Sequence, residues 1–285
     1  MVGQLRTHLA GEAQHPEGAF WPVNSERAGH ALVHWLGAGE VSSALGGTVT
    51  VVRHGDTPEL ATRARQFLQN TGGYLSSRAA EDALVRAGVR RASEPEEIWP
   101  GDAEAEIQRV LAPLFAGTTP EDRRLAASGM TAVHAAFRVV SAVQARRGRT
   151  AWLQLGWLYL DMSQVLKKFT PDPARDYLCQ RDVFDLAALE SLLAQHGERM
   201  AGIIMEAPTN PLVETPDVAA VAALARRHGV RVVIDPAISS PFNVDVLPHA
   251  DVVAFSLTKY AAHAGDVLGH RPNRSAYAYG GDSRQ

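Results

Sequence analysis

One lysine in this sequence follows two hydroxyl residues at the end of a short apolar run. The run Val252–Phe255 leads into Ser256, Leu257, Thr258 and Lys259. Such a run is typical of a buried strand whose carboxyl end presents the next side chains to a ligand. A lysine there loses its proton through desolvation and forms a Schiff base with a carbonyl group, while nearby hydroxyls hydrogen-bond a phosphate. The alternative is that Lys259 only follows an edge strand into solvent, and this short motif does not decide between the two.

Two further apolar runs end in side chains that suit the same chemistry. A Schiff base beside a phosphate site meets the needs of pyridoxal phosphate, whose ring nitrogen draws electrons only while it is protonated. Asp235 closes the run Val230–Ile234, so its carboxylate is a candidate partner for that nitrogen. Asn210 follows the run Ile203–Met205, and its amide is a candidate partner for the phenolic oxygen. Taken alone, Asp235 is also typical of a helix cap or a metal ligand.

A turn of small residues precedes an apolar helical stretch. Ser128, Gly129, Met130 and Thr131 run directly into the stretch Ala132–Val143. The first turn of a helix carries unpaired backbone N–H groups at the positive end of the helix dipole, which is a ready site for a phosphate. Without further information, the same turn indicates only a capped helix start.

These segments, in their order along the chain, resemble the cystathionine γ-synthase family of transsulfuration enzymes, which are fold-type I pyridoxal-phosphate proteins. The matching segments are E-A-P-T-N-P (206–211), V-V-I-D (232–235), F-S-L-T-K-Y (255–260) and G-D-V-L-G (265–269). The resemblance is closest to the fungal-type branch of the family. That branch has G-x-x-Y-x-D where this chain has Gly156–Asp161, and N-V-D-V-L-P-x-A-D-V-V where this chain has Asn243–Val253. The resemblance extends from about Phe67 to Gly269.

The resemblance implies a role for each candidate residue. Lys259 would form the Schiff base with the cofactor and move protons at the substrate's α and β carbons. Asp235 would keep the ring nitrogen protonated, Tyr159 would stack on the ring and also serve catalysis, and Asn210 would orient the phenolic oxygen. The residues implied to hold the phosphate are Gly129, Met130, Ser256 and Thr258. No metal site is expected.

The resemblance also implies a reaction, the γ-replacement that joins cysteine to an O-acylated homoserine in methionine biosynthesis. Two alternatives stay open. One is a truncated relative that binds pyridoxal phosphate without turnover or acts only as a subunit. The other is a different fold-type I enzyme, such as a γ- or β-lyase or an aminotransferase. The motif Tyr159-Leu160-Asp161-Met162 differs from the Y-G-G-T of the larger branch, so substrate contacts known from that branch do not carry over.

The pattern of elements predicts an α/β fold with a mostly parallel sheet wrapped by helices. Helices that begin at Asp185 and Asp217 are each followed by a strand, 202–206 and 231–235. This alternation is typical of parallel sheets, which bind ligands at the carboxyl ends of their strands. We therefore expect Tyr159, Asn210, Asp235 and Lys259 to meet at one edge of the sheet, in the major domain of a fold-type I enzyme.

The sequence predicts three regions. Residues 1–100 form an N-terminal segment that is family-like only from about residue 67, and 94–102 has the acidic, proline-containing composition of a linker. Residues 101–269 form the cofactor-binding domain. Residues 270–285 have no periodicity and predict a disordered tail, and we expect the family's small C-terminal domain to be absent. Within the N-terminal segment, Arg78 either meets a phosphate or carboxylate or is a solvated surface charge.

Composition excludes several other classes of function. The formal net charge is −3, which does not favour nucleic acid or an anionic membrane surface as a partner. The single cysteine, Cys179, excludes an internal disulfide, and no apolar run approaches the roughly 20 residues of a membrane helix. We expect a cytoplasmic protein that acts on small amino acids. The resemblance implies a homo-oligomer, either a dimer or a tetramer.

Overall fold

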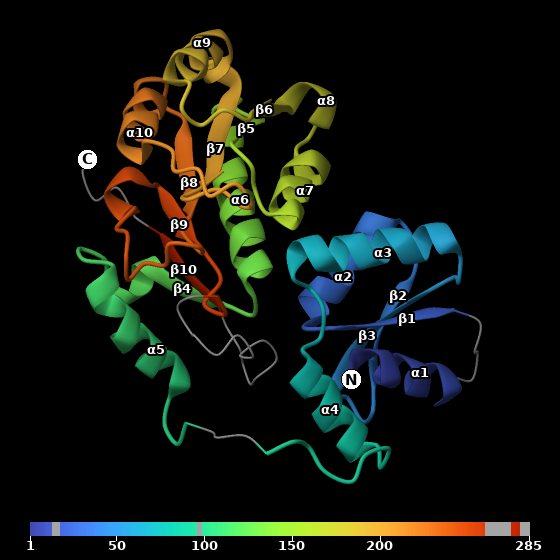
Figure 1. The fold of residues 1–285 in the computed structure, drawn as a ribbon. Coiled ribbons are helices and arrows are strands. Elements are labelled where there is room, and N and C mark those ends of the chain that lie inside the picture. The colour runs from blue at the N-terminus through green and yellow to red at the C-terminus, as the bar shows by residue number, and fades with distance from the viewer. Residues whose placement is uncertain (13–17, 96–98, 260–274, 280–285) are drawn as a thin grey trace. The chain divides into compact units, whose positions relative to one another are not determined.

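The computed structural model describes residues 1–12, 18–95, 99–259 and 275–279. The chain divides after Ile98 into an N-terminal unit and a larger unit, which are described separately (Figure 1). Within the described ranges, no helix is both long and apolar enough to cross a bilayer.

The N-terminal unit contains a three-stranded antiparallel sheet in the order β1-β3-β2. Its elements are α1 (Val2–Glu12), β1 (Ala19–Val23), α2 (Glu26–Leu36), β2 (Glu40–Ala44), β3 (Val49–His54), α3 (Pro58–Thr71) and α4 (Ser77–Arg86). Leu5 and Leu9 of α1 pack with Val51 of β3 and Leu84 of α4, so this unit has an apolar core of its own. The helix α2 begins where the Ser25 side chain accepts a hydrogen bond from the Ala28 N–H at 3.2 Å.

The larger unit alternates helices and strands along most of its length. Its helices are α5 (Ala103–Leu111), α6 (Gly129–Ala145), α7 (Leu160–Phe169), α8 (Pro173–Asp176), α9 (Leu186–His196) and α10 (Val218–Arg227). Its strands are β4 (Arg123–Ala126), β5 (Ala151–Leu155), β6 (Tyr177–Gln180), β7 (Met200–Glu206), β8 (Arg231–Asp235), β9 (Val252–Ala254) and β10 (Ser275–Tyr279). The described strands form one sheet in the order β4-β10-β9-β8-β7-β5-β6.

Five neighbouring strands of this sheet, from β6 through β5, β7 and β8 to β9, run parallel. Each parallel step returns through a crossover that lies outside the sheet, as parallel connections require. The predicted α/β fold with a mostly parallel sheet is therefore confirmed.

Strand β7 lies near the middle of the sheet and is buried along its whole length. Alternate side chains of a strand point to opposite faces. Ile203 and Met205 accordingly pack with α9 and α10, whereas Ile204 packs with α6 and α7. Helices on both faces therefore keep water from β7 along its length.

The helix starts that the sequence indicates at two aspartates are also confirmed. Asp185 accepts a hydrogen bond from the Ala188 N–H at 2.8 Å, and Asp217 accepts one from the Ala220 N–H at 2.9 Å. Each carboxylate accepts a hydrogen bond from an N–H group that the first turn leaves unpaired. Its negative charge also interacts favourably with the positive end of the helix dipole.

The structure differs from the sequence prediction near the end of the chain. Strand β10 spans Ser275–Tyr279, inside the stretch for which the sequence predicts a disordered tail. It pairs antiparallel with both β4 and β9. Its sequence S-A-Y-A-Y alternates with a period of two, which is the pattern of a strand. Other residues of the predicted tail lie outside the described residues.

Candidate functional site

The carboxyl ends of the parallel strands bring the predicted site residues to one edge of the sheet. Asp235 is the last residue of β8, and Tyr159, Asn210 and Lys259 follow β5, β7 and β9. Because these strands run in one direction, their carboxyl ends share an edge. This edge is the candidate site.

Asp235 lies close enough to Lys259 for their charges to interact. Its side chain is half-buried, and its Oδ1 accepts a hydrogen bond from the Ala237 N–H at 2.8 Å. Desolvation raises the pKa of Asp235 to about 7, while the Ala237 N–H and the positive charge of Lys259 act in the opposite direction. A cationic ring nitrogen beside Asp235 would favour its charged form in the same way.

Lys259 lies in a turn after β9. Its backbone N–H donates to the Ser256 carbonyl at 3.5 Å, and the residue is exposed. The desolvation of Lys259 that the sequence predicts is therefore not found, because the chain has already left the sheet when it reaches the lysine. An exposed amine beside a carboxylate is nevertheless accessible to a carbonyl compound.

The start of α6 touches the hydroxyl residues that precede Lys259. A Cβ atom added at Gly129 would lie 2.7 Å from the Ser256 Cβ and 3.1 Å from its Cα, so only glycine permits this approach. The Ser256 and Thr258 hydroxyl oxygens are 2.6 Å apart. The segment after β9 and the first turn of α6 thus form one cluster of polar groups.

The first turn of α6 leaves backbone N–H groups outside the helix's own hydrogen bonds. The Ser128 side chain accepts from the Thr131 N–H at 3.1 Å, which caps the helix. The N–H groups of Gly129 and Met130 precede the first intrahelical bond, so they are donors at the positive end of the helix dipole. With Ser256 beside them, they suit an anion such as a phosphate.

Tyr159 is the residue before α7 and is 47% exposed. Desolvation and a hydrogen bond to Asp161 raise the pKa of the Tyr159 hydroxyl, so it keeps its proton at neutral pH. The exposed ring is free to lie against a flat ligand. A protonated hydroxyl acts as a donor or an acid rather than as a base.

Asn210 lies in a tight loop after β7. Thr209, which is fully buried, anchors this loop: its backbone N–H donates to the Glu214 carbonyl at 2.8 Å, and its Oγ1 accepts from the Glu214 N–H at 3.0 Å. Asn210 itself is half-buried, and its backbone N–H bonds to the carboxylate of Glu206.

Glu206 is a residue of this edge to which the sequence analysis gives no role. It ends β7 directly beside Asp235 of β8, and it is only 4% exposed. Desolvation and the negative charge of Asp235 raise the pKa of Glu206 to about 8. The signal in the sequence is a glutamate that closes an apolar strand, at a position where a charged residue is rarely buried without partners.

Arg78 belongs to the N-terminal unit and has a local partner. It lies on α4, and its Nη1 donates to the buried carboxylate of Glu81 at 3.2 Å. Arg90 reaches the same carboxylate at 3.2 Å. This ion pair lies within the helix and tests neither alternative for Arg78, whose role stays a prediction.

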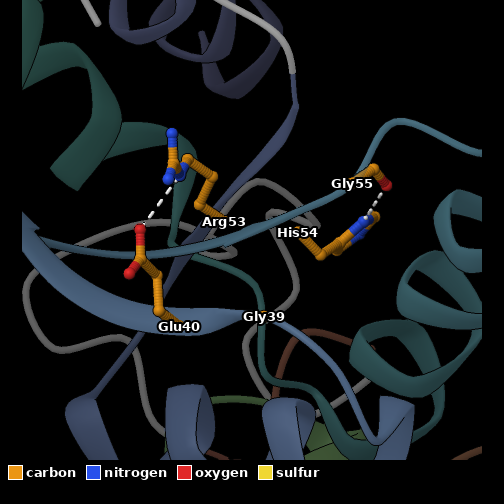
Figure 2. A pocket seen from close by; sticks show the side chains of 5 residues that line it. All are labelled: Gly39, Glu40, Arg53, His54 and Gly55. Atoms are coloured by element: carbon orange, nitrogen blue, oxygen red, sulfur yellow. Dashed lines mark hydrogen bonds and ion pairs between the residues drawn. The ribbon is translucent and has the colours of Figure 1, made fainter. Parts of the chain in front are cut away.

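A pocket in the N-terminal unit is a second place to consider (Figure 2). It is lined by Gly39, Glu40, Arg53, His54 and Gly55. The polar groups of its wall are paired with one another: Arg53 Nε donates to Glu40 Oε1 at 3.0 Å, and His54 Nδ1 lies 2.7 Å from the Gly55 carbonyl. His54 Nε2 accepts from the Trp21 indole at 2.8 Å, so Nδ1 carries the proton. These pairings explain the wall as part of the fold, and none of the site motifs lies here.

The residues at the edge of the large sheet fit pyridoxal phosphate. A lysine, an aspartate with its pKa raised to about 7, and a helix start packed against two hydroxyls are present together. The close approach that only Gly129 permits leaves backbone donors and hydroxyls for the phosphate, while Asp235 and Lys259 suit the ring nitrogen and the carbonyl.

Comparisons with known proteins agree with this chemistry. A family model described as Cys/Met metabolism PLP-dependent enzyme matches residues 104–270. Over 213 residues the chain is 43% identical to the L-2-amino-4-chloropent-4-enoate dechlorinase/desaturase of Streptantibioticus cattleyicolor. The matched region covers 75% of this chain and 42% of that protein. Over 258 residues the chain is 29% identical to the cystathionine gamma-synthase of Neurospora crassa. That matched region covers 84% of this chain and 41% of the Neurospora protein.

A solved structure shares the fold of the larger unit's family. Apo CalE6, a methionine gamma lyase from Micromonospora echinospora, matches with a TM-score of 0.50 and 25% identity, over 66% of this chain and 47% of that chain. This chain spans about two fifths of the length of the first two curated relatives. Because the family model covers more than half of the chain, from residue 104 to residue 270, the resemblance, the fold-type I architecture and the cofactor inferred from the sequence are confirmed: the chain belongs to the Cys/Met metabolism PLP-dependent enzyme family.

Proposed function

We propose that this chain supplies the cofactor-binding domain of a transsulfuration-type enzyme that joins cysteine to an O-acylated homoserine by γ-replacement. The observation that carries the proposal is the meeting of Lys259, Asp235 and the Gly129–Ser256 contact at one edge of the sheet. When bound, pyridoxal phosphate supplies an electron sink for the charge that develops at the substrate's carbon atoms.

Each residue of the edge has a distinct part in this proposal. Lys259 holds the cofactor covalently and moves protons at the α and β carbons of the substrate. Asp235 keeps the proton on the ring nitrogen, Tyr159 covers the ring with its exposed side chain, and Asn210 orients the phenolic oxygen. The phosphate is held by Gly129, Met130, Ser256 and Thr258.

A second candidate function is the removal of a halogen from an amino acid. It is favoured by one comparison, since the identity to the Streptantibioticus dechlorinase/desaturase is 43% and that to the Neurospora cystathionine gamma-synthase is 29%. Both reactions remove a group from the substrate's side chain after the cofactor has activated it. The same central residues therefore serve either one.

The test is a product assay with the purified protein and pyridoxal phosphate. O-acetyl- and O-succinylhomoserine are each supplied with cysteine and analysed for cystathionine, and 2-amino-4-chloropent-4-enoate is analysed for chloride. The proposal predicts that the first pair of substrates gives cystathionine and that Lys259→Ala gives none. Chloride release alone would favour the second candidate. If the parent forms no more product than Lys259→Ala on any substrate, the alternative of a non-catalytic relative holds. Homo-oligomeric assembly and a cytoplasmic location stay predictions of the sequence.

A further inference from the structure

The carboxyl group of Glu206 connects two loops of the site. Its Oε1 accepts a hydrogen bond from the Tyr159 backbone N–H at 2.5 Å, and the carboxylate also accepts one from the Asn210 backbone N–H. Tyr159 follows β5 and Asn210 follows β7, so one side chain holds the starts of two different loops. These two loops carry the side chains assigned to the face and to the phenolic oxygen of the cofactor ring.

Glu206 is well placed to hold these loops rigidly. Glu206 is only 4% exposed, so water has little access to the accepting carboxyl group. A carboxyl oxygen accepts hydrogen bonds from backbone N–H groups in either protonation state, and it has room for more than one donor. The glutamate lies on a central strand, which fixes its own position from both sides.

The neighbour of Glu206 is the residue assigned to the ring nitrogen. Glu206 and Asp235 are paired in register at the ends of β7 and β8. Three assigned contacts of the ring therefore depend on a single pair of strand ends: Asp235 directly, and Tyr159 and Asn210 through Glu206.

We propose that Glu206 is a positioning residue for the cofactor, which ties the backbones of Tyr159 and Asn210 to the end of β7 and so orients the ring against Asp235. This inference rests on the proposed function, because it assumes that the ring binds at this edge. Its hydrogen bonds to Tyr159 and Asn210 are with backbone groups, so we assign it a positioning role and no part in the reaction itself.

The experiment compares two substitutions at Glu206. Glu206→Gln keeps an acceptor oxygen of the same reach, whereas Glu206→Met has similar length without a strong acceptor. Glu190→Gln is the matched control, because Glu190 is exposed on α9 and pairs only at the surface with Arg227. Equilibrium dialysis gives the dissociation constant of pyridoxal phosphate, and the visible circular dichroism per bound cofactor reports how firmly the ring is oriented.

We expect Glu206→Met to raise the dissociation constant by about 10- to 100-fold, because the backbone N–H groups of Tyr159 and Asn210 lose their acceptor. At saturating cofactor its visible circular dichroism should also weaken, whereas Glu206→Gln and Glu190→Gln should match the parent in both measurements. A merely structural role would lower thermal stability without changing the signal per bound cofactor. Equal affinity and equal signal in Glu206→Met and the parent would overturn the inference.

Amide hydrogen exchange of the parent tests the same contact if Glu206→Met does not fold. The Tyr159 and Asn210 amides should exchange slowly in the parent and in Glu206→Gln, and rapid exchange of both would contradict the inference. Failure of the proposed cofactor site is a different result, since the parent itself would then bind no pyridoxal phosphate, and failure of turnover alone would appear only in the product assay.

Discussion

At the scale of single residues, the site depends on a contact that leaves no room for a side chain. Gly129 begins α6 and lies against Ser256, whose Cβ would be 2.7 Å from an added methyl group. Since the obstacle includes the Ser256 Cα at 3.1 Å, the backbone after β9 would have to shift. That backbone carries Thr258 and Lys259.

We therefore predict that Gly129→Ala weakens binding of pyridoxal phosphate at least about tenfold and lowers the free energy of unfolding by about 1–3 kcal/mol. The control is Gly3→Ala, a helical glycine of α1 with no atom within 4 Å of an added Cβ. Gly3→Ala should leave affinity unchanged and raise stability slightly, because alanine favours a helix. Dialysis and urea unfolding measure both quantities, and equal behaviour of the two variants would contradict the prediction.

The two neighbouring carboxyl groups predict a pH dependence of the cofactor-free protein. In the folded state the pKa is raised to about 8 for Glu206 and to about 7 for Asp235, from ordinary values of 4.5 and 3.8. The folded chain therefore keeps protons that the unfolded chain releases, and stability must fall as the pH rises from about 5 to 8.

Glu206→Gln removes one of these groups and should flatten this decline. The slope that Glu206 contributes is at most about 1.4 kcal/mol per pH unit. Urea unfolding of the parent and of Glu206→Gln at a series of pH values between 5 and 8 measures the difference. Parallel curves for the two proteins would show that Glu206 does not keep its proton.

At the scale of elements, one arginine joins the chain segments at the amino ends of the parallel strands, away from the candidate site. Arg149, just before β5, donates through Nη1 to the carbonyls of Gly197 at 2.9 Å and His228 at 2.8 Å. It also lies 3.3 Å from the carbonyl of Met200, the first residue of β7. This contact stabilises the amino ends of the sheet, whereas the candidate site lies at the carboxyl ends.

Arg149→Ala should thus lower the free energy of unfolding by about 2–3 kcal/mol, the usual range for a charged hydrogen bond, while cofactor affinity stays near the parent value. Arg147→Ala is the matched control, because Arg147 is exposed in the turn after α6, and a change there should stay within about 0.5 kcal/mol. Equal stability of the two variants would contradict the role of Arg149.

The elements also show where prediction from sequence works. The starts of α9 and α10 follow from Asp185 and Asp217, because a capping carboxylate is a local signal. The helix α2 is missed although Ser25 and the left-handed Gly37 (φ 69°) mark its two ends. Between these two signals, glycine and histidine residues interrupt the apolar spacing typical of a helix. Whether the segment is helical therefore depends on its packing against the rest of the unit.

The candidate site is predicted to a similar degree. Lys259, Asp235 and Ser256 are motif residues, and strand direction alone indicates a common edge. The role of Glu206 does not follow from the motif, because it depends on a contact with the backbone of Tyr159, far away in the sequence. The exposure of Lys259 is equally invisible, since it depends on where β9 ends.

At the scale of the whole molecule, each of the two units has its own apolar core. In the N-terminal unit, the buried His54 accepts from the Trp21 indole at 2.8 Å, a pairing between β1 and β3. His54→Ala leaves that indole without its acceptor and opens a cavity.

We expect His54→Ala to lower the unfolding temperature of the N-terminal unit while binding of pyridoxal phosphate stays unchanged. The reason is that every residue assigned to the cofactor belongs to the larger unit, which begins at Trp99. Calorimetry with and without the cofactor separates the two effects. A loss of cofactor binding as large as the loss of thermal stability would show that the two units do not act separately.

Lys259 is the residue proposed to carry the cofactor, and the composition of the chain allows a direct test. The sequence has three lysines, Lys167, Lys168 and Lys259, so a map of modified lysines is unambiguous. The protein is incubated with equimolar pyridoxal phosphate, reduced with borohydride, digested and analysed by mass spectrometry. We expect a pyridoxyl group on Lys259 in most molecules, little on the neighbouring pair in α7, and much less on Lys259 in Asp235→Asn. Modification spread equally over the three lysines, or absent from Lys259, would contradict it.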